Sequence, residues 1–98
     1  MLFRSVAGVD HFGNLALWAT ARHMMDAGLA QGQRVWVATA KGGRSQATVG
    51  RTFADVPRGA LLIYPDSHGL VSVARNGGSA MEQVRARAGE VVAIMRQE

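Results

Sequence analysis

Short apolar segments separated by glycine turns recur along this chain, and that pattern constrains its fold most. Residues 34–39 (Arg-Val-Trp-Val-Ala-Thr) alternate and are rich in β-formers, as in a half-buried strand. Residues 41–44 (Lys-Gly-Gly-Arg) follow directly and predict a hairpin loop, because glycine adopts a positive φ at little cost. Glycine turns between such segments favour short strands over long helices.

Seven segments predict strands on these grounds, and two predict short helices. The strand segments are residues 2–9, 15–18, 34–39, 45–52, 60–64, 70–74 and 91–95. Thr20 can cap a helix that extends to Ala30, and Ser79 and Glu82 have capping-box spacing at the start of a helix toward Ala88. The chain is therefore predicted to form one mainly β domain over residues 1–98. We expect a small antiparallel Greek-key β-barrel or sandwich with one or two short helices.

The composition narrows the class of protein. A hydrophobic share of 48% and a charged share of 18% are typical of a globular domain. No window has the roughly 18 apolar residues of a membrane span, and the first residues lack the apolar run of a signal peptide. The chain has no cysteine, hence no disulfide or thiolate metal site, and we expect a cytoplasmic protein.

The basic residues are scattered along the sequence. Eleven basic against seven acidic side chains give a net charge of +4. A nucleic-acid-binding surface usually shows clustered basic residues with aromatic residues between them. Neither feature is present, so nucleic acid is not favoured as a partner.

Polar residues cluster at predicted strand ends. The clusters are Asp-His-Phe-Gly-Asn at 10–14, Thr-Phe-Ala-Asp-Val-Pro at 52–57 and Asp-Ser-His-Gly at 66–69. The third leads into a strand that ends Arg-Asn-Gly-Gly-Ser at 75–79. Loops at strand ends often carry binding residues. Asp, Asn and Gly are also the residues of ordinary turns, so each cluster alone is compatible with a turn.

Familiar catalytic arrangements do not fit these clusters. The consecutive side chains of Asp66, Ser67 and His68 diverge and cannot form a triad among themselves. The three histidines lack metal-ligand spacing, so no metal site is expected. His23 is predicted to lie on a helix beside the core.

Taken in order, four motifs resemble the C-terminal domain of the S-adenosylmethionine hydroxide adenosyltransferases, a domain shared with fluorinating and chlorinating enzymes. They are Asp-His-Phe-Gly-Asn-Leu at 10–15, Thr-Phe-Ala-Asp-Val at 52–56, Asp-Ser-His-Gly at 66–69 and Ala-Arg-Asn-Gly-Gly-Ser-Ala at 74–80. A Gly-Glu-Val-Val segment at 89–92 closes the pattern. Each motif is weak alone, but their order covers nearly the whole chain.

The resemblance implies a barrel-like β-domain that supplies half of a nucleoside site. In the family an N-terminal α/β domain precedes this domain. Trimers place one subunit's N-terminal domain against a neighbour's C-terminal domain, with S-adenosylmethionine between them. Water or hydroxide (halide in the halogenases) attacks the 5′ carbon of the ribose and releases methionine. S-adenosylmethionine is thus the implied substrate, and no cofactor is expected.

The resemblance also implies roles at the methionine end of the substrate. Asp10 would bind the ammonium group, and Ser67 would bind the same end of the molecule. His68 stands where the halogenases tend to carry arginine. Histidine holds a carboxylate less firmly than a guanidinium does, which argues against a halogenase.

At the adenine end, the resemblance implies four further contacts. Asn14 would hydrogen-bond the base, and the ring of Phe53 would stack on it, a contact worth roughly 1–3 kcal/mol. The main chain around Arg75 and Gly77 would read the adenine edge. The chain departs from the family at 17–18, where Leu-Trp replaces the usual Thr-Asn.

No segment of the sequence corresponds to the N-terminal α/β half, so we assign no catalytic residue and expect no turnover by this chain alone. It is either part of a longer enzyme or a stand-alone relative. The alternative function is a stand-alone β-barrel module that binds an adenosine-like metabolite, a protein partner or, less favoured, single-stranded nucleic acid.

Several residues have a purely structural interpretation as well. Trp18, Trp36 and residues 61–63 are predicted to lie in the core, with a subunit contact as the alternative for Trp18. Met24 and Met25 are predicted to pack beside the core. Phe53 fits a core position at a strand end as well as it fits a binding role, and Arg75 fits a solvated surface position.

Overall fold

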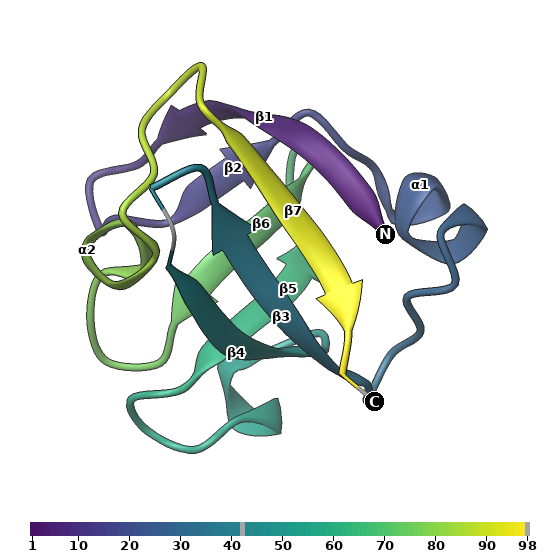
Figure 1. The fold of residues 1–98 in the computed structure, drawn as a ribbon. Coiled ribbons are helices and arrows are strands. Elements are labelled where there is room, and N and C mark those ends of the chain that lie inside the picture. The colour runs from purple at the N-terminus through teal and green to yellow at the C-terminus, as the bar shows by residue number, and fades with distance from the viewer. Residues whose placement is uncertain (42, 98) are drawn as a thin grey trace.

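Seven strands close into one barrel in the computed structural model, which describes residues 1–41 and 43–97 (Figure 1). The strands are β1 (Leu2–Val9), β2 (Leu15–Leu17), β3 (Arg34–Thr39), β4 (Arg44–Val49), β5 (Leu61–Pro65), β6 (Val71–Arg75) and β7 (Val91–Arg96). Two helices, α1 (Ala21–Asp26) and α2 (Ala80–Val84), and a 3₁₀ turn, η1 (Phe53–Asp55), complete the fold. The prediction of a mainly β barrel with short helices is confirmed.

The order of strands around the barrel is β1-β2-β6-β5-β4-β3-β7, with β7 returning to β1. All neighbours are antiparallel except β4 and β5, which are parallel. The expectation of a purely antiparallel barrel is therefore wrong at one pair. Residues 50–60, which include η1, carry the chain back across the barrel, and such a crossover is what a parallel pair requires.

The predicted hairpin at 41–44 joins β3 to β4, which pair antiparallel with Ala38 opposite Arg44. Thr39 donates its N–H to the carbonyl oxygen of Gly43 at 3.1 Å. Gly42, the first residue of the predicted Gly-Gly turn, lies outside the described residues.

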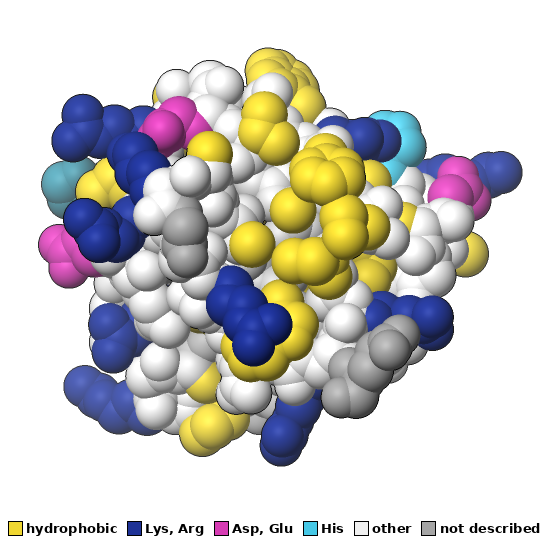
Figure 2. Space-filling model, viewed as in Figure 1, with side chains coloured by type: hydrophobic (Ala, Val, Ile, Leu, Met, Phe, Trp, Pro, Cys, Tyr) yellow, Lys and Arg dark blue, Asp and Glu magenta, His cyan; other side chains and the backbone are white. Residues whose placement is uncertain are grey.

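The barrel interior is filled by alternate residues of the strands. Val35 and Val37 of β3 are fully buried in this interior, as are Leu61 and Ile63 of β5. Leu62 is also fully buried, but it faces the outer side of β5 and packs beside Gly50, so residues 61–63 are all buried as predicted. The core prediction is wrong for Trp18, which is 61% exposed, and for Trp36, which is half-buried on the outside of the barrel. Because successive strand residues point to opposite faces, burial of Val35 and Val37 turns Trp36 outward. Figure 2 shows hydrophobic side chains gathered on this outer face, over β1, β7 and β3.

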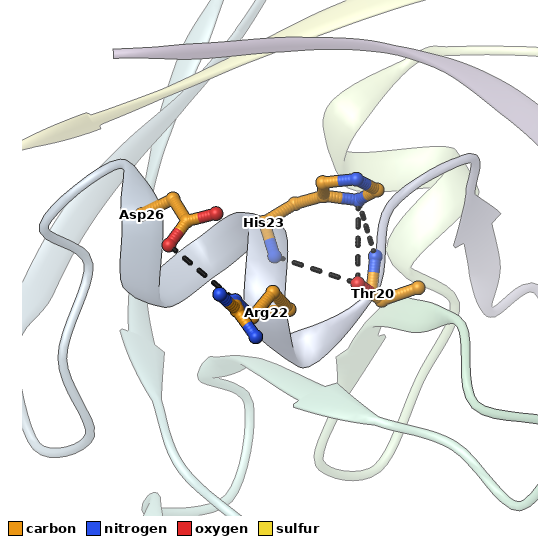
Figure 3. A network of polar contacts seen from close by, with 4 residues as sticks. All are labelled: Thr20, Arg22, His23 and Asp26. Atoms are coloured by element: carbon orange, nitrogen blue, oxygen red, sulfur yellow. Dashed lines mark hydrogen bonds and ion pairs between the residues drawn. The ribbon is translucent and has the colours of Figure 1, made fainter.

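Helix α1 begins where predicted, after the cap residue Thr20, but it ends at Asp26 rather than Ala30 (Figure 3). Gly28 follows the cap with a φ of +76°, which terminates the helix. His23 is exposed, not beside the core: its N–H donates to Thr20 Oγ1 at 3.4 Å, and its Nδ1 accepts from Thr20 N–H at 2.9 Å. Met24 packs into the core as predicted, whereas Met25 is 72% exposed.

Helix α2 begins after Ser79, whose Oγ accepts the N–H of Glu82 at 3.3 Å, as the capping-box spacing predicts. It ends at Val84, before the predicted Ala88, because Arg85 adopts the left-handed conformation with a φ of +63°. None of the described helices is long and apolar enough to cross a membrane.

Candidate functional site

The first polar cluster forms a closed turn between β1 and β2. Asp10 Oδ1 accepts the N–H groups of Phe12 and Asn14, both at 2.9 Å. Asn14 Nδ2 donates to Asp10 Oδ2 at 2.9 Å, and Asp10 N–H donates to the Asn14 carbonyl oxygen at 3.0 Å. Gly13, with a φ of +84°, completes the turn and packs against Ser79. The cluster therefore forms the turn that its Asp, Asn and Gly residues predict.

The third polar cluster forms the same turn between β5 and β6. Asp66 Oδ1 accepts the N–H groups of His68 at 2.8 Å and Leu70 at 3.1 Å. Gly69 has a φ of +85°, matching Gly13 of the first turn. Since β2 pairs with β6, the two turns lie on neighbouring hairpins of the barrel.

The hydrogen bonds of the first turn keep Asp10 ionised. Partial burial acts to raise the pKa of this carboxyl group. The bonds from Asn14, Phe12 and Gly13 together outweigh that effect and lower the pKa below its ordinary value of 3.8. Asp10 is thus a fixed negative charge at neutral pH, and it is exposed to solvent.

Both turns border one depression of about 610 Å³, which we call the Asp10 pocket. Four of the predicted site residues line it: Asp10, Asn14, Ser67 and His68. A register shift in β1 between Val6 and Gly8 brings the strand to the pocket wall, and such bulges are frequent beside binding sites. The volume is within the range of small-molecule sites.

A second depression of about 420 Å³, the Phe53 pocket, holds the remaining predicted residues: Phe53, Arg75 and Gly77. Asn14 lines this pocket as well, so the two depressions adjoin at its side chain. All seven residues predicted for the site therefore lie on two adjoining hollows, although they come from four separate segments of the sequence.

The turn that carries Phe53 is fixed by hydrogen bonds from two side chains to its main chain. Asp55 Oδ2 accepts the N–H groups of Arg51 at 2.7 Å and Thr52 at 3.1 Å, which fixes the start of η1. Asn76 Nδ2 donates to the carbonyl oxygens of Phe53 at 3.3 Å and Val56 at 3.0 Å. Phe53 is 42% exposed, so it is not a core residue; it lines the pocket, and its ring centroid lies 6.2 Å from that of Tyr64.

The wall opposite Phe53 is built from Arg75 and the glycines that follow it. Arg75 Nε donates to the carbonyl oxygen of Gly59 at 3.2 Å, and the side chain is partly buried against Gly78. The alternative of a freely solvated arginine is therefore wrong. Gly77 lines the pocket with a φ of +80°, and the side chain of Arg58 packs against it, 3.4 Å from the position that a Cβ would take.

Nine residues that the sequence prediction did not include also line the two pockets, and four of them carry an aromatic ring, a carboxylate or a hydroxyl group. Phe12, 75% exposed, lies on the Phe53 pocket, and Asp66, Tyr64 and Ser72 lie on the Asp10 pocket. Ser72 is the one polar side chain that is buried among the described residues. Tyr64 of β5 and Ser72 of β6 are paired across the two strands and point to the outside of the barrel. This alternation along the strands is what places them on the pocket floor. No three His, Asp or Glu side chains gather in a metal-binding group within residues 1–41 and 43–97.

Comparison with known proteins identifies the domain. The sequence profile of the S-adenosylmethionine hydroxide adenosyltransferase C-terminal domain matches residues 4–93. The chain belongs to this family. The resemblance of the four motifs is thus confirmed.

Two relatives of this chain are named (R)-S-adenosyl-L-methionine hydrolase. The protein from Salinispora arenicola (strain CNS-205) is 38% identical over 89 residues, which cover 91% of this chain and 31% of that protein. The protein from Salinispora tropica (strain CNB-440) is 40% identical over 77 residues, or 79% of this chain and 26% of that protein. The chain therefore spans about a third of the length of the relatives that it matches.

Solved structures agree with the family fold. A conserved protein from Thermotoga maritima superposes with a TM-score of 0.89 at 30% identity, over 96% of this chain and 35% of the other. A conserved hypothetical protein from Thermus thermophilus gives a TM-score of 0.66 at 33% identity, over 95% and 34% of the two chains. The family barrel is again about a third of each longer protein.

Proposed function

We propose that this barrel forms the nucleoside- and amino-acid-binding half of an enzyme that hydrolyses S-adenosylmethionine to adenosine and methionine. The observation that carries the proposal is the position of Asn14, which lines both pockets and joins them into one elongated site. S-adenosylmethionine is itself elongated, with a charged amino-acid end and a flat base. The family and its named hydrolase relatives support the same reaction.

The Asp10 pocket suits the methionine end. The carboxylate of Asp10 stays ionised and can accept a charge-assisted hydrogen bond from the substrate ammonium group. Asp66 places a second carboxylate at the other end of the same pocket, because β2 and β6 are antiparallel, and this charge adds to the attraction for a cation. Ser67 and His68 supply polar groups for the substrate carboxylate.

The Phe53 pocket suits the adenine end. Phe53 and Phe12 present two exposed aromatic side chains on which a base can stack. The Asn14 side-chain amide donates one N–H to Asp10 and can offer its second N–H and its oxygen to the purine edge. The main chain at Gly77 lines the same pocket.

The proposed reaction breaks the bond between the ribose 5′ carbon and the sulfonium sulfur. The electron pair of that bond stays on sulfur and neutralises its charge, while a water oxygen bonds to the 5′ carbon and loses a proton. None of the seven site residues is assigned as base or nucleophile. The barrel binds and orients the substrate, and an N-terminal family domain, in an oligomer such as a trimer, supplies the other half of the site.

The decisive experiment is reconstitution. The N-terminal part of the Salinispora arenicola hydrolase, joined to this chain in place of its own C-terminal third, is expected to release adenosine and methionine from S-adenosylmethionine. Asp10→Asn is the sharpest variant, because the amide oxygen can still accept the Phe12 and Asn14 main-chain N–H groups, while the charge and the acceptor of the Asn14 side-chain amide are lost. We expect at least about a tenfold loss of kcat/KM.

The matched control is Asp26→Asn, which removes an exposed carboxylate from α1 that lines neither pocket. Equal turnover by the Asp10→Asn and Asp26→Asn fusions would contradict the role of Asp10. The stand-alone binding module and the nucleic-acid reader are not favoured, since the family match covers the domain of an S-adenosylmethionine-using enzyme. Binding of single-stranded nucleic acid that weakens steeply with salt would revive the latter.

A further inference from the structure

Both tryptophans of the chain lie on the outside of the barrel, on one apolar face. The strand register places outward side chains in rows across β1, β7 and β3: Phe3 is opposite Ala93, which is opposite Ala38. In the next row, Met95 is opposite Trp36. This is the yellow area over β1, β7 and β3 in Figure 2.

Trp18 extends this face at the end of β2. The main-chain N–H of Trp18 donates to the carbonyl oxygen of Ser5 at 3.0 Å, and Ser5 is opposite Val91 of β7. We define the outer apolar face by six residues: Met1, Phe3, Trp18, Trp36, Val91 and Met95. Four of them are about half exposed or more, with exposed fractions of 65% for Met1, 58% for Phe3, 61% for Trp18 and 48% for Val91. A contiguous group of this kind marks an interaction surface, whereas single exposed apolar residues do not.

The rim of the face is basic. The guanidinium of Arg44 lies 4.0 Å from the centroid of the Trp36 ring, and Arg34 is two residues from Trp36 on the same side of β3. The whole chain carries a net charge of +4. Two copies of this chain would repel through these charges, so the face fits a partner with an apolar centre and an acidic rim.

The relatives indicate which partner that is. The family domain is by its description C-terminal, and it makes up 31% of the Salinispora arenicola protein. In such proteins the preceding chain must enter the barrel through the strand equivalent to β1. The first residues of β1 lie in the outer apolar face. A domain that precedes the barrel therefore emerges at this face.

We propose that the outer apolar face is the docking surface for the N-terminal domain of this family. The face borders the Asp10 pocket at Trp18, which follows the pocket residue Ala16 by two positions. The rest of the face extends away from the pocket, over β7 and β3 (Figure 1). The inference rests on the two-domain enzyme of the proposed function but not on substrate binding.

The test uses the two tryptophans as reporters. The chain, labelled with 5-fluorotryptophan, has two fluorine signals, one for each tryptophan. It is titrated with the separately produced, unlabelled N-terminal two-thirds of the Salinispora arenicola hydrolase, without S-adenosylmethionine. We expect both signals to shift, with a Kd of about 10–100 μM, which is typical of a weak domain contact.

Two variants and a matched control locate the contact. Phe3→Asp puts a charge in the centre of the face and is expected to weaken docking at least about tenfold. Arg44→Glu reverses a rim charge and weakens it by a smaller factor, because rim charges are solvated. Met25→Asp, at a methionine that is 72% exposed on α1, changes the affinity less than about twofold.

Three results would overturn the proposal. They are unshifted fluorine signals, equal weakening by Phe3→Asp and Met25→Asp, and self-association of the chain that Phe3→Asp abolishes. The last result would assign the face to a second copy. The Asp10→Asn variant separates this proposal from the proposed function, since it should lower turnover of S-adenosylmethionine in the fusion enzyme yet dock as the unchanged chain does.

Discussion

Asn14 Nδ2 donates a hydrogen bond to Asp10 Oδ2 at 2.9 Å, and this bond distinguishes two otherwise equivalent turns of the barrel. In the second turn Leu70 stands where Asn14 stands in the first, and its N–H still bonds to Asp66 Oδ1 at 3.1 Å. The turn therefore forms without an amide at its last position. At Asn14 the amide is an addition to the scaffold, which supports a role in binding.

The first prediction follows from that comparison. Asn14→Leu gives the first turn the pattern of the second, so the midpoint of thermal unfolding should change by only a few degrees. Adenosine binding, measured by calorimetry, should weaken at least about tenfold because a buried base edge loses its partner. Leu70→Asn is the control and should leave the affinity unchanged. Unaltered adenosine affinity in Asn14→Leu would remove this residue from the site.

The second prediction compares the glycines of the two turns. Gly13 and Gly69 have nearly equal φ values of +84° and +85°, so alanine causes the same backbone strain, roughly 1–2 kcal/mol, at either position. A Cβ at Gly13 would also overlap the Ser79 side chain, whereas nothing lies within 4 Å of a Cβ at Gly69. Gly13→Ala should therefore lower the free energy of unfolding more than Gly69→Ala, as measured by urea denaturation. Equal losses of unfolding free energy would show that α2 shifts away from the added methyl group without any loss of stability.

Strand positions could be predicted from the sequence because each strand is short and bounded by turn residues. Arg34–Thr39 is the clearest case, and the structure reproduces its bounds. The side of the sheet was harder to predict at Trp36, because the predicted alternation of residues 34–39 is not kept at Val35, Trp36 and Val37, where no polar residue marks the outside. In such an apolar run, packing with the other strands decides the orientation.

The candidate site was likewise only partly predictable. Its residues could be named from the motifs, but the two pockets meet at Asn14 because β2 pairs with β6, a contact between segments far apart in the sequence. The 3₁₀ turn η1 was not predicted, although Thr52 and Asp55 have capping-box spacing and both reciprocal hydrogen bonds form. Tyr64 and Ser72 carried no motif at all, because their place on the pocket floor comes from register alone.

The third prediction concerns the start of α1, where His23 takes the place that Glu or Gln usually has in a capping box (Figure 3). His23→Ala removes the acceptor for Thr20 N–H and should lower the free energy of unfolding by about 0.5–1 kcal/mol. His23→Gln restores an acceptor and should recover most of that loss. Chemical denaturation of the three proteins measures both effects. If His23→Gln were as unstable as His23→Ala, the hydrogen bond to the His23 side chain would not stabilise the helix.

The last prediction is the pH dependence contributed by Asp55, which supports the turn that carries Phe53. Hydrogen bonds from the N–H groups of Arg51 and Thr52 lower the pKa of Asp55 below its ordinary value of 3.8, against a smaller opposing effect of burial. A carboxyl group whose pKa is lower in the folded state stabilises the fold above the unfolded pKa, and this stability is lost as the pH falls through the folded pKa. Asp55→Ala should therefore lower the midpoint of thermal unfolding at pH 7.

The difference between the unchanged chain and Asp55→Ala should then shrink as the pH is lowered below 3.8, the value that the unfolded carboxyl group keeps. Asp26→Ala is the control at pH 7, because the Asp26 carboxylate has only an exposed contact with Arg22 at 3.7 Å and its removal should have little effect. Adenosine affinity should fall with Asp55→Ala and not with Asp26→Ala, since only the first loosens Phe53. A midpoint difference between Asp55→Ala and the unchanged chain that stays constant from pH 7 to below 3.8 would show that the ionised carboxylate does not support η1.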